Sequence, residues 1–139
     1  MITSSLTTST TINHPNYIGY ELSKYGIDYE RYNIDDSNIS EFMVVDGNKH
    51  ISFDVFTSDH PINVNLHYHN DDEARLIISG WGTFEIMIDD RIATLVVTAG
   101  DYISIPAGII HTFKSTEPIK TIRYFVNNNP YTAIYTDST

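Results

Sequence analysis

Short runs of hydrophobic residues, many of them β-branched or aromatic, alternate with polar turn signals along most of the chain. The turn signals include DGN, SDHP, NDD, AGD and PAG, and such clusters of Gly, Pro, Asn and Asp end strands. The runs between them are rich in Ile, Val, Phe, Tyr and Thr and predict strands. The expected strands cover residues 42–45, 50–56, 62–69, 73–79, 82–88, 91–98, 102–105, 111–114, 119–126 and 131–135.

One segment has the spacing of a helix instead. Ile18, Leu22 and Tyr25 recur three or four residues apart, which places them on one face of a helix. A proline precedes this segment and a glycine follows it, as is typical of helix starts and ends. We therefore predict one short N-terminal helix over residues 16–25.

The hairpin sequence GTFEIMIDDRIATLVV has the alternation of a strand with one buried face. Phe84, Ile86 and Ile88 are separated by Glu85 and Met87, and side chains two apart on a strand share a face. Many such strands with no second helical pattern predict an all-β barrel or sandwich.

The length of 139 residues suits one domain, since a domain takes about 100 to 200 residues. No repeat or linker divides the chain, so we expect a single domain over residues 16–139 after a flexible, Ser/Thr-rich tail over residues 1–15. The tail has no positive charge and no apolar region. We expect neither a secretory signal nor a transit peptide, and predict a cytoplasmic protein.

The net charge of -10 and the absence of cysteine narrow the possible partners. A surface this acidic repels nucleic acid and anionic membranes, and no hydrophobic run approaches the roughly 18 residues that cross a bilayer. We expect a small-molecule partner, with no nucleic acid and no membrane. Without cysteine, any transition metal must be held by nitrogen and oxygen.

Candidate ligand chemistry is concentrated in the stretch LHYHNDDEARLIISG. His67 and His69 are two apart, so on a strand they project from one face. Glu73 and Arg75 return to that face if the strand resumes in phase after NDD. A further histidine, His111, opens a later strand in GDYISIPAGIIHTF. Taken singly, each histidine could be a surface residue or a satisfied core residue.

Two motifs contain these residues and resemble the paired motifs of the cupin barrels. The first reads H-x-H-x3-E-x6-G and ends at Gly80, and the second reads G-x5-P-x-G-x2-H and begins at Gly100. The resemblance implies an all-β cupin β-barrel (a double-stranded β-helix, or jelly roll) that binds one metal ion through His67, His69, Glu73 and His111. Burying these groups without a metal would leave polar atoms that are costly to satisfy. The remaining histidines are expected in loops or on the surface: His14, His50 and His60.

Beyond the ligands, the chain resembles the acireductone dioxygenase family over residues 20 to 126. The similar segments are DDEARLIISGWGTFEI, AGDYISIPAGIIHTF, IKTIRYF and, upstream, LSKYGIDYERYNI, in which Tyr32 replaces the family's tryptophan. Family members carry a helical segment between this entrance and the barrel. Here residues 35–56 have the pattern of turns and strands, so we expect that helical layer to be missing.

The resemblance also implies three residues that line a substrate pocket: Arg75, Phe113 and Arg123. Guanidinium groups beside a metal favour an anionic ligand in a site sheltered from water, and Phe113 would give an apolar wall. Two alternatives remain open. Arg75 could pair with a nearby acid such as Asp72, and Phe113 could simply be a core residue.

The function implied by the resemblance is a metal-dependent dioxygenase that binds an enediolate-like anion through two oxygens and cleaves it with O2. Iron(II) is the expected metal, and nickel, manganese, cobalt or zinc also suits such ligands. We expect a monomer or a homodimer. The alternatives are a cupin isomerase, cyclase or lyase that works without O2, and a small-ligand-binding cupin without turnover.

Overall fold

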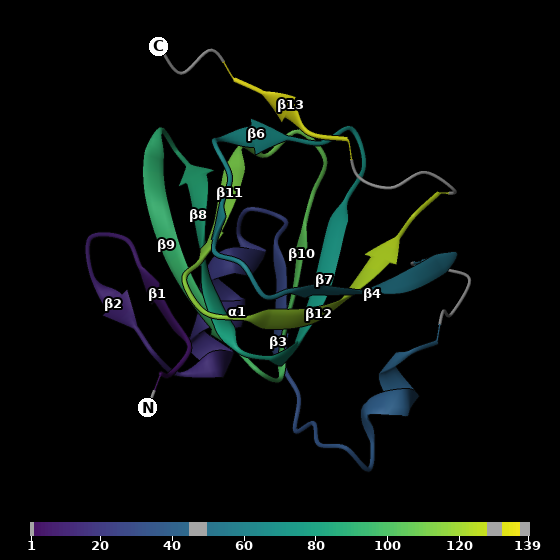
Figure 1. Ribbon diagram of the computed structural model, residues 1–139. Helices are drawn as coiled ribbons and strands as arrows, with labels where there is room; N and C mark the ends of the chain where they lie inside the picture. The colour runs from purple at the N-terminus through teal and green to yellow at the C-terminus, as the bar shows by residue number, and fades with distance from the viewer. Residues whose placement is uncertain (1, 45–49, 128–131, 137–139) are drawn as a thin grey trace.

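The computed structural model describes residues 2–44, 50–127 and 132–136, and two antiparallel sheets dominate it (Figure 1). The larger sheet has the order β13-β6-β11-β8-β9-β1-β2, with β5 paired to β11. Its strands are β1 (Ser5–Thr7), β2 (Thr11–Ile12), β5 (Ile62–Asn63), β6 (His67–Tyr68), β8 (Trp81–Ile88), β9 (Arg91–Thr98), β11 (His111–Ser115) and β13 (Ile134–Tyr135). Non-consecutive neighbours such as β11 and β6 bring distant segments together.

The smaller sheet has the order β3-β10-β7-β12-β4. Its strands are β3 (Asp28–Arg31), β4 (Ser52–Ser58), β7 (Glu73–Ser79), β10 (Asp101–Ile105) and β12 (Ile119–Phe125). Side chains of both sheets meet in one core, where Phe84 and Leu95 of the larger sheet pack with Ile77 and Ile103 of the smaller one. The prediction of an all-β barrel with one short α-helix is therefore confirmed.

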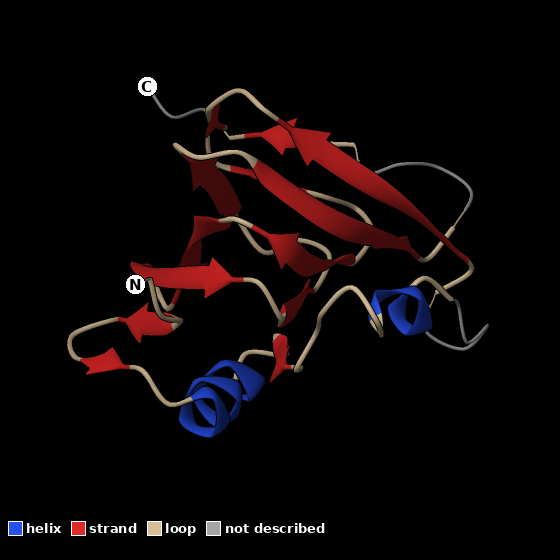
Figure 2. Cartoon of the chain, turned by 60° about the horizontal axis from the view of Figure 1, so that its bottom comes forward, coloured by secondary structure: helices blue, strands red, loops and turns tan. Residues whose placement is uncertain are grey.

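The α-helix α1 (Pro15–Ser23) lies close to the range expected for it, outside the strand layers (Figure 2). Its apolar face buries Ile18 and Leu22. His14 caps its first turn, because the Nδ1 atom accepts a hydrogen bond from the backbone N–H of Asn16 at 3.2 Å. Over the described ranges, none of the helices has the length and hydrophobicity needed to span a bilayer.

The first residues differ from the flexible tail expected over residues 1–15. Strand β1 pairs with β9, with Leu6 opposite Leu95, and Leu6 is only 1% exposed. Ser4 donates a hydrogen bond from Oγ to the buried carboxylate of Asp101 at 2.5 Å. The polar Ser/Thr composition hid this strand, because a single buried leucine gives no alternating pattern.

The strand expected over residues 42–45 is wrong for its described part. Phe42 ends a 3₁₀ helix, η1 (Ile39–Phe42), and Val44 is irregular, while residue 45 lies outside the described residues. The chain makes local turn bonds here, since the backbone N–H of Met43 donates to the carbonyl of Ser40 at 3.2 Å. Such local bonds compete with strand formation. As expected, no long helix occurs in the described part of residues 35–56.

The strand expected over residues 62–69 is broken into β5 and β6. Between them Val64 is tied to β11, because its carbonyl accepts a hydrogen bond from the Thr112 hydroxyl. The carbonyl of Asn65 accepts a hydrogen bond from the ring of His67 at 2.8 Å instead of from a neighbouring strand. The break therefore contributes to the orientation of a candidate ligand.

Candidate metal centre

The structure brings together the four residues that sequence analysis assigned to a metal. His67 in β6 and His111 in β11 face each other across one strand pair, and His69 follows directly after β6. Glu73 begins β7 in the opposite sheet. One ligand atom of each residue lies within 4.8 Å of the others. The cluster thus spans the interior between the two sheets.

These four side chains are almost completely withdrawn from solvent. The exposed fractions are 6% for His67, 7% for His69, 4% for Glu73 and 2% for His111. Burial of this many polar groups is costly unless each has a partner. The four side chains therefore belong to the barrel interior, where each polar group needs a partner.

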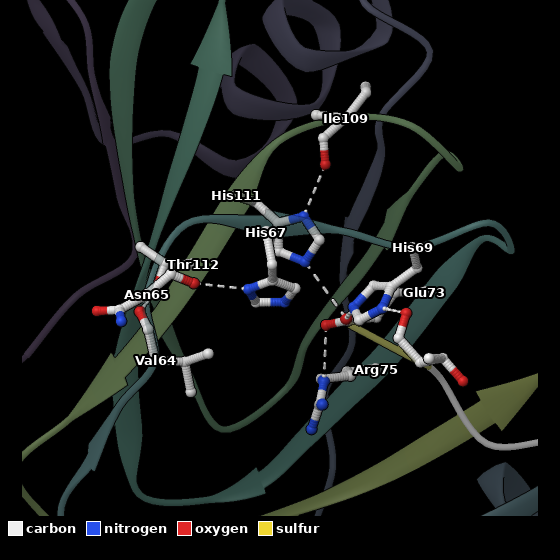
Figure 3. Close-up of polar contacts among 10 residues, drawn as sticks. Val64, Asn65, His67, His69, Glu73, Arg75, Ile109, His111 and Thr112 are labelled. Carbon is white, nitrogen blue, oxygen red and sulfur yellow. Dashed lines mark hydrogen bonds and ion pairs between the residues drawn. The ribbon is translucent and has the colours of Figure 1, made fainter. Parts of the chain in front are cut away.

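Each imidazole is held by a backbone carbonyl at Nδ1, as Figure 3 shows for the cluster. The partners are Asn65 for His67 at 2.8 Å, Thr132 for His69 at 2.9 Å, and Ile109 for His111 at 2.9 Å. A carbonyl oxygen only accepts, so Nδ1 must carry the hydrogen in all three rings. In the neutral rings the lone pair then resides on Nε2.

The Nε2 atoms point toward the carboxylate of Glu73. The distances to Oε1 are 2.7 Å from His69 and 3.3 Å from His111. Two lone pairs this close to a carboxylate oxygen repel each other unless a proton or a cation lies between them. Three nitrogen lone pairs and a carboxylate converging on one point suit a divalent transition metal, and histidine ligands usually donate their other N–H as here. The residues present therefore fit a metal cofactor.

The electrostatics of Glu73 favour its ionised, ligating form. Burial opposes ionisation, but the Arg75 guanidinium, together with the neighbouring His111 and His69, outweighs it, so the pKa of Glu73 lies well below its ordinary value. Arg75 donates from Nε to Oε2 of Glu73 at 2.9 Å. Oε2 is thus held by the arginine while Oε1 faces the imidazoles.

The surroundings of His67 and His69 shift the pKa values of these two histidines in opposite directions. Burial lowers the pKa of His67. Burial also opposes the charged form of His69, but the hydrogen bonds that this form makes to Glu73 and to the Thr132 carbonyl, together with the Glu73 charge, outweigh burial and raise its pKa. A neutral imidazole is the form that binds a metal. The lowered pKa of His67 therefore keeps it available as a ligand.

A cavity of about 200 Å³ opens beside the cluster. All four candidate ligands line it, and so do the three residues assigned to a substrate pocket: Arg75, Phe113 and Arg123. Phe56, Ile62 and Val64 supply apolar wall. The cavity therefore combines a polar end, two guanidinium groups and an apolar side.

Arg75 forms an ion pair and Phe113 is buried in the core, and both side chains also line the cavity. Arg75 does pair with an acid, but the acid is Glu73; Asp72 instead accepts from the backbone N–H of Ala107 at 2.9 Å. Phe113 is a core residue, 8% exposed, and it also lines the cavity. Its ring lies over Gly82, where an added Cβ would be 2.4 Å from the Phe113 Cζ. The glycine therefore makes room for this wall.

Two residues that the sequence pattern did not single out hold Arg123 in place. Asp54 binds it with two hydrogen bonds, from Nε at 2.8 Å and from Nη2 at 2.5 Å. The ring of Phe56 lies under both guanidinium groups, 5.2 Å from Arg123 and 5.8 Å from Arg75. The alternation of the β4 segment already put these two side chains on one face. Pairing of β4 with β12, which the sequence does not reveal, brings them to the arginines.

Two of the histidines outside the motifs are surface residues, as expected. His14 is the exposed cap of α1, and His60 lies beside Asp59 with its side chain 87% exposed. His50 is a loop residue, but it is only partly exposed. Its ring stacks on Tyr124 with centroids 4.9 Å apart.

Comparison with solved structures identifies the fold. The acireductone dioxygenase of Bacillus anthracis, with a cadmium ion in its active centre, matches with a TM-score of 0.76 and 22% identity over 97% of this chain and 99% of that chain. An oxalate decarboxylase variant from Bacillus subtilis matches with a TM-score of 0.51 and 21% identity over 78% of this chain and 27% of that chain. These similarities confirm the predicted cupin β-barrel.

Curated relatives and a family model identify the family. The acireductone dioxygenase of Leptospira biflexa is 45% identical over 74 residues, which is 52% of this chain and 42% of the relative. That of Aquifex aeolicus is 31% identical over 152 residues, which is 91% of this chain and 83% of the relative. This chain therefore spans less than half of the Leptospira protein. The model described as the ARD/ARD′ family matches residues 19–133. The chain belongs to the ARD/ARD′ family.

Proposed function

We propose that the protein is a metal-dependent dioxygenase of the acireductone type, which binds an enediolate-like anion and cleaves it with O2. One observation carries the proposal: three imidazoles and a carboxylate converge at the end of a cavity that two guanidinium groups also line. Membership of the family and the names of the relatives support it.

His67, His69, Glu73 and His111 would hold the metal, which is proposed to be iron(II). A related structure with a cadmium ion in its active centre supports the presence of a metal. When bound, the metal supplies Lewis acidity that favours the deprotonated enediol and orders its two oxygens. These four residues would leave room on the metal for a substrate that binds through two oxygens.

The chain's own residues contribute charge and shape. Arg75 and Arg123 place positive charge in the cavity, where low polarity strengthens attraction for an anion. Asp54 and Phe56 fix the Arg123 guanidinium, so little reorganisation is needed when a ligand enters. Phe113, Ile62 and Val64 give an apolar wall that limits access of water to a reactive enediolate.

Metal analysis combined with an oxygen-electrode assay tests the proposal. The purified protein is expected to hold about one metal ion per chain, as a single four-residue site allows. Loaded with iron(II), it is expected to consume O2 only when a synthetic acireductone is added. His111→Ala is expected to lose most of the metal and the oxygen uptake while keeping its strand content. The matched control is His60→Ala, which removes an exposed imidazole and is expected to behave as the wild type.

The same assay separates the competing functions. Product formation at an unchanged rate without O2 would replace the proposal by an isomerase, cyclase or lyase. Stabilisation of the protein by the compound with no product would make it a binding protein. Normal metal content in His111→Ala would refute the ligand assignment itself.

A further inference from the structure

A second cavity, of about 320 Å³, lies on the outer face of the smaller sheet. Successive residues of a strand point to opposite faces. Leu76 and Tyr124 line this outer cavity, whereas their neighbours Arg75 and Arg123 line the inner one beside the metal centre. The two cavities therefore lie on opposite sides of the same sheet.

Aromatic rings form the walls of the outer cavity. Tyr102 and Tyr124 meet edge to face with centroids 6.2 Å apart, and the His50 ring stacks on Tyr124 at 4.9 Å. On the side of η1, Tyr32 and Phe42 are tilted against each other at 5.3 Å. All five rings line the cavity. Their π faces carry partial negative charge, which attracts cations.

Hydrogen bonds hold these walls in position. The Tyr124 hydroxyl donates to the carbonyl of Phe42 at 2.6 Å and so fastens η1 to the sheet. Tyr102 Oη lies 3.4 Å from Nε2 of His50. Burial and the neighbouring Tyr102 raise the pKa of Tyr124 to about 12. The Tyr124 side chain therefore stays neutral. Because these hydrogen bonds join the aromatic walls to one another, the cavity is formed before a ligand binds.

The described residues that line the cavity carry charge of one sign. Asp28, Glu30 and Glu41 are among them, and no lysine or arginine is, within the part of the chain that the structure describes. The Tyr32 hydroxyl donates to the Glu30 carboxylate, which joins an aromatic wall to a charged one. Three carboxylates beside five aromatic rings oppose an anion and favour a cation with an apolar surface.

We propose that this outer cavity binds a small organic cation, namely an alkylated ammonium group. Inorganic cations suit it less, because they prefer a full shell of oxygen ligands to aromatic faces. The volume is in the range that holds a small ligand. The site is separate from the metal centre, so cation binding does not depend on oxygenase activity.

Choline and its neutral isostere, 3,3-dimethylbutan-1-ol, test the role of charge directly. Each is titrated into the metal-loaded protein by calorimetry at constant ionic strength, in buffer alkaline enough for free imidazole to be neutral. Choline is expected to bind saturably, and the isostere roughly tenfold more weakly or not measurably, because it fits the same space without the charge. Equal binding of the two compounds, or no saturable binding of choline at millimolar concentrations, would overturn the proposal.

Paired variants test the location. Tyr32 is 38% exposed, so its replacement is expected to leave the fold intact. Tyr32→Leu, which removes the ring, is expected to weaken choline binding several-fold, whereas Tyr32→Phe keeps the ring and most of the binding. Glu30→Gln removes one charge and is also expected to weaken it. Tyr17→Leu, on the exposed face of α1, is the control. Binding unchanged in both Tyr32→Leu and Glu30→Gln would place choline elsewhere and refute the site.

Discussion

At the scale of single residues, the two arginines of the inner cavity have different tasks. Arg75 donates to the carboxylate of Glu73, a candidate ligand. Arg123 is held by Asp54 and by the ring of Phe56. Removal of Arg75 should therefore disturb the metal centre, whereas removal of Arg123 should disturb only the binding of an anion.

We predict that Arg75→Ala lowers metal affinity and substrate binding together. Outer partners of metal ligands typically change metal affinity about 10 to 100-fold. Arg123→Ala is expected to keep the metal affinity and raise KM. Metal titration and steady-state kinetics on both variants measure the difference. Identical metal affinities in the two variants would mean that Arg75 does not act through Glu73.

Gly82 provides a second prediction at this scale. An added Cβ would lie 2.4 Å from Cζ and 2.8 Å from Cε1 of Phe113, so Gly82→Ala is expected to destabilise the fold by about 1–3 kcal/mol through overpacking. The two shortest contacts are with the far edge of a ring, and the third, 2.9 Å, is with the Lys114 carbonyl oxygen. Phe113→Leu should therefore recover part of that loss, but not all of it, in the double variant. Urea denaturation of the double-mutant cycle measures the coupling, and purely additive effects would contradict the contact.

At the scale of elements, the sequence predicted the strands with clear alternation well. The residues of β7, β8 and β9 occupy almost the ranges expected for them. In β8 the signal is alternation over eight residues, and in β7 it is a short hydrophobic run between turn residues. The failures come from interactions that local pattern does not contain. Strand β1 forms by pairing with β9, and the chain near Phe42 follows a local turn bond from Met43 to Ser40.

The N-terminal strand allows a direct test. Leu6 is 1% exposed in the core, so Leu6→Ala is expected to lower the free energy of unfolding by about 2–5 kcal/mol. Ile2, which is 46% exposed, is the control, and Ile2→Ala should stay within about 0.5 kcal/mol of the wild type. Denaturant unfolding distinguishes the two. If both substitutions change the free energy of unfolding equally and only slightly, the N-terminal segment is a flexible tail, as its composition suggests.

At the scale of the whole molecule, the candidate centre joins the two sheets, since His67 and His111 come from one and Glu73 from the other. The motif spacing predicted which residues would converge. It did not predict Asp54 and Phe56, because a sequence pattern gives the face of a strand but not its partner strand. Nor did it predict the outer cavity, which is lined by residues of β3, η1, β7, β10 and β12 and of the segments beside them.

A metal held between the sheets should stabilise the whole fold. We predict that loading raises Tm, since a ligand present at about 100 times its Kd stabilises the native state by about 2.7 kcal/mol. Chelation should lower Tm again without loss of strand content, because the carbonyl partners of the histidines and the common core remain. Thermal unfolding followed by circular dichroism measures both. The same experiment on His111→Ala should give a much smaller shift, and an equal shift would point to a metal site elsewhere.

The most direct test of the central claim is a crystal structure of the metal-loaded protein with an anomalous difference map recorded at the absorption edge of the metal. We predict one strong peak per chain, within bonding distance of Nε2 of His67, His69 and His111 and of a carboxylate oxygen of Glu73. A metal peak at any other place, or bonded through Nδ1 of these histidines, would contradict the account.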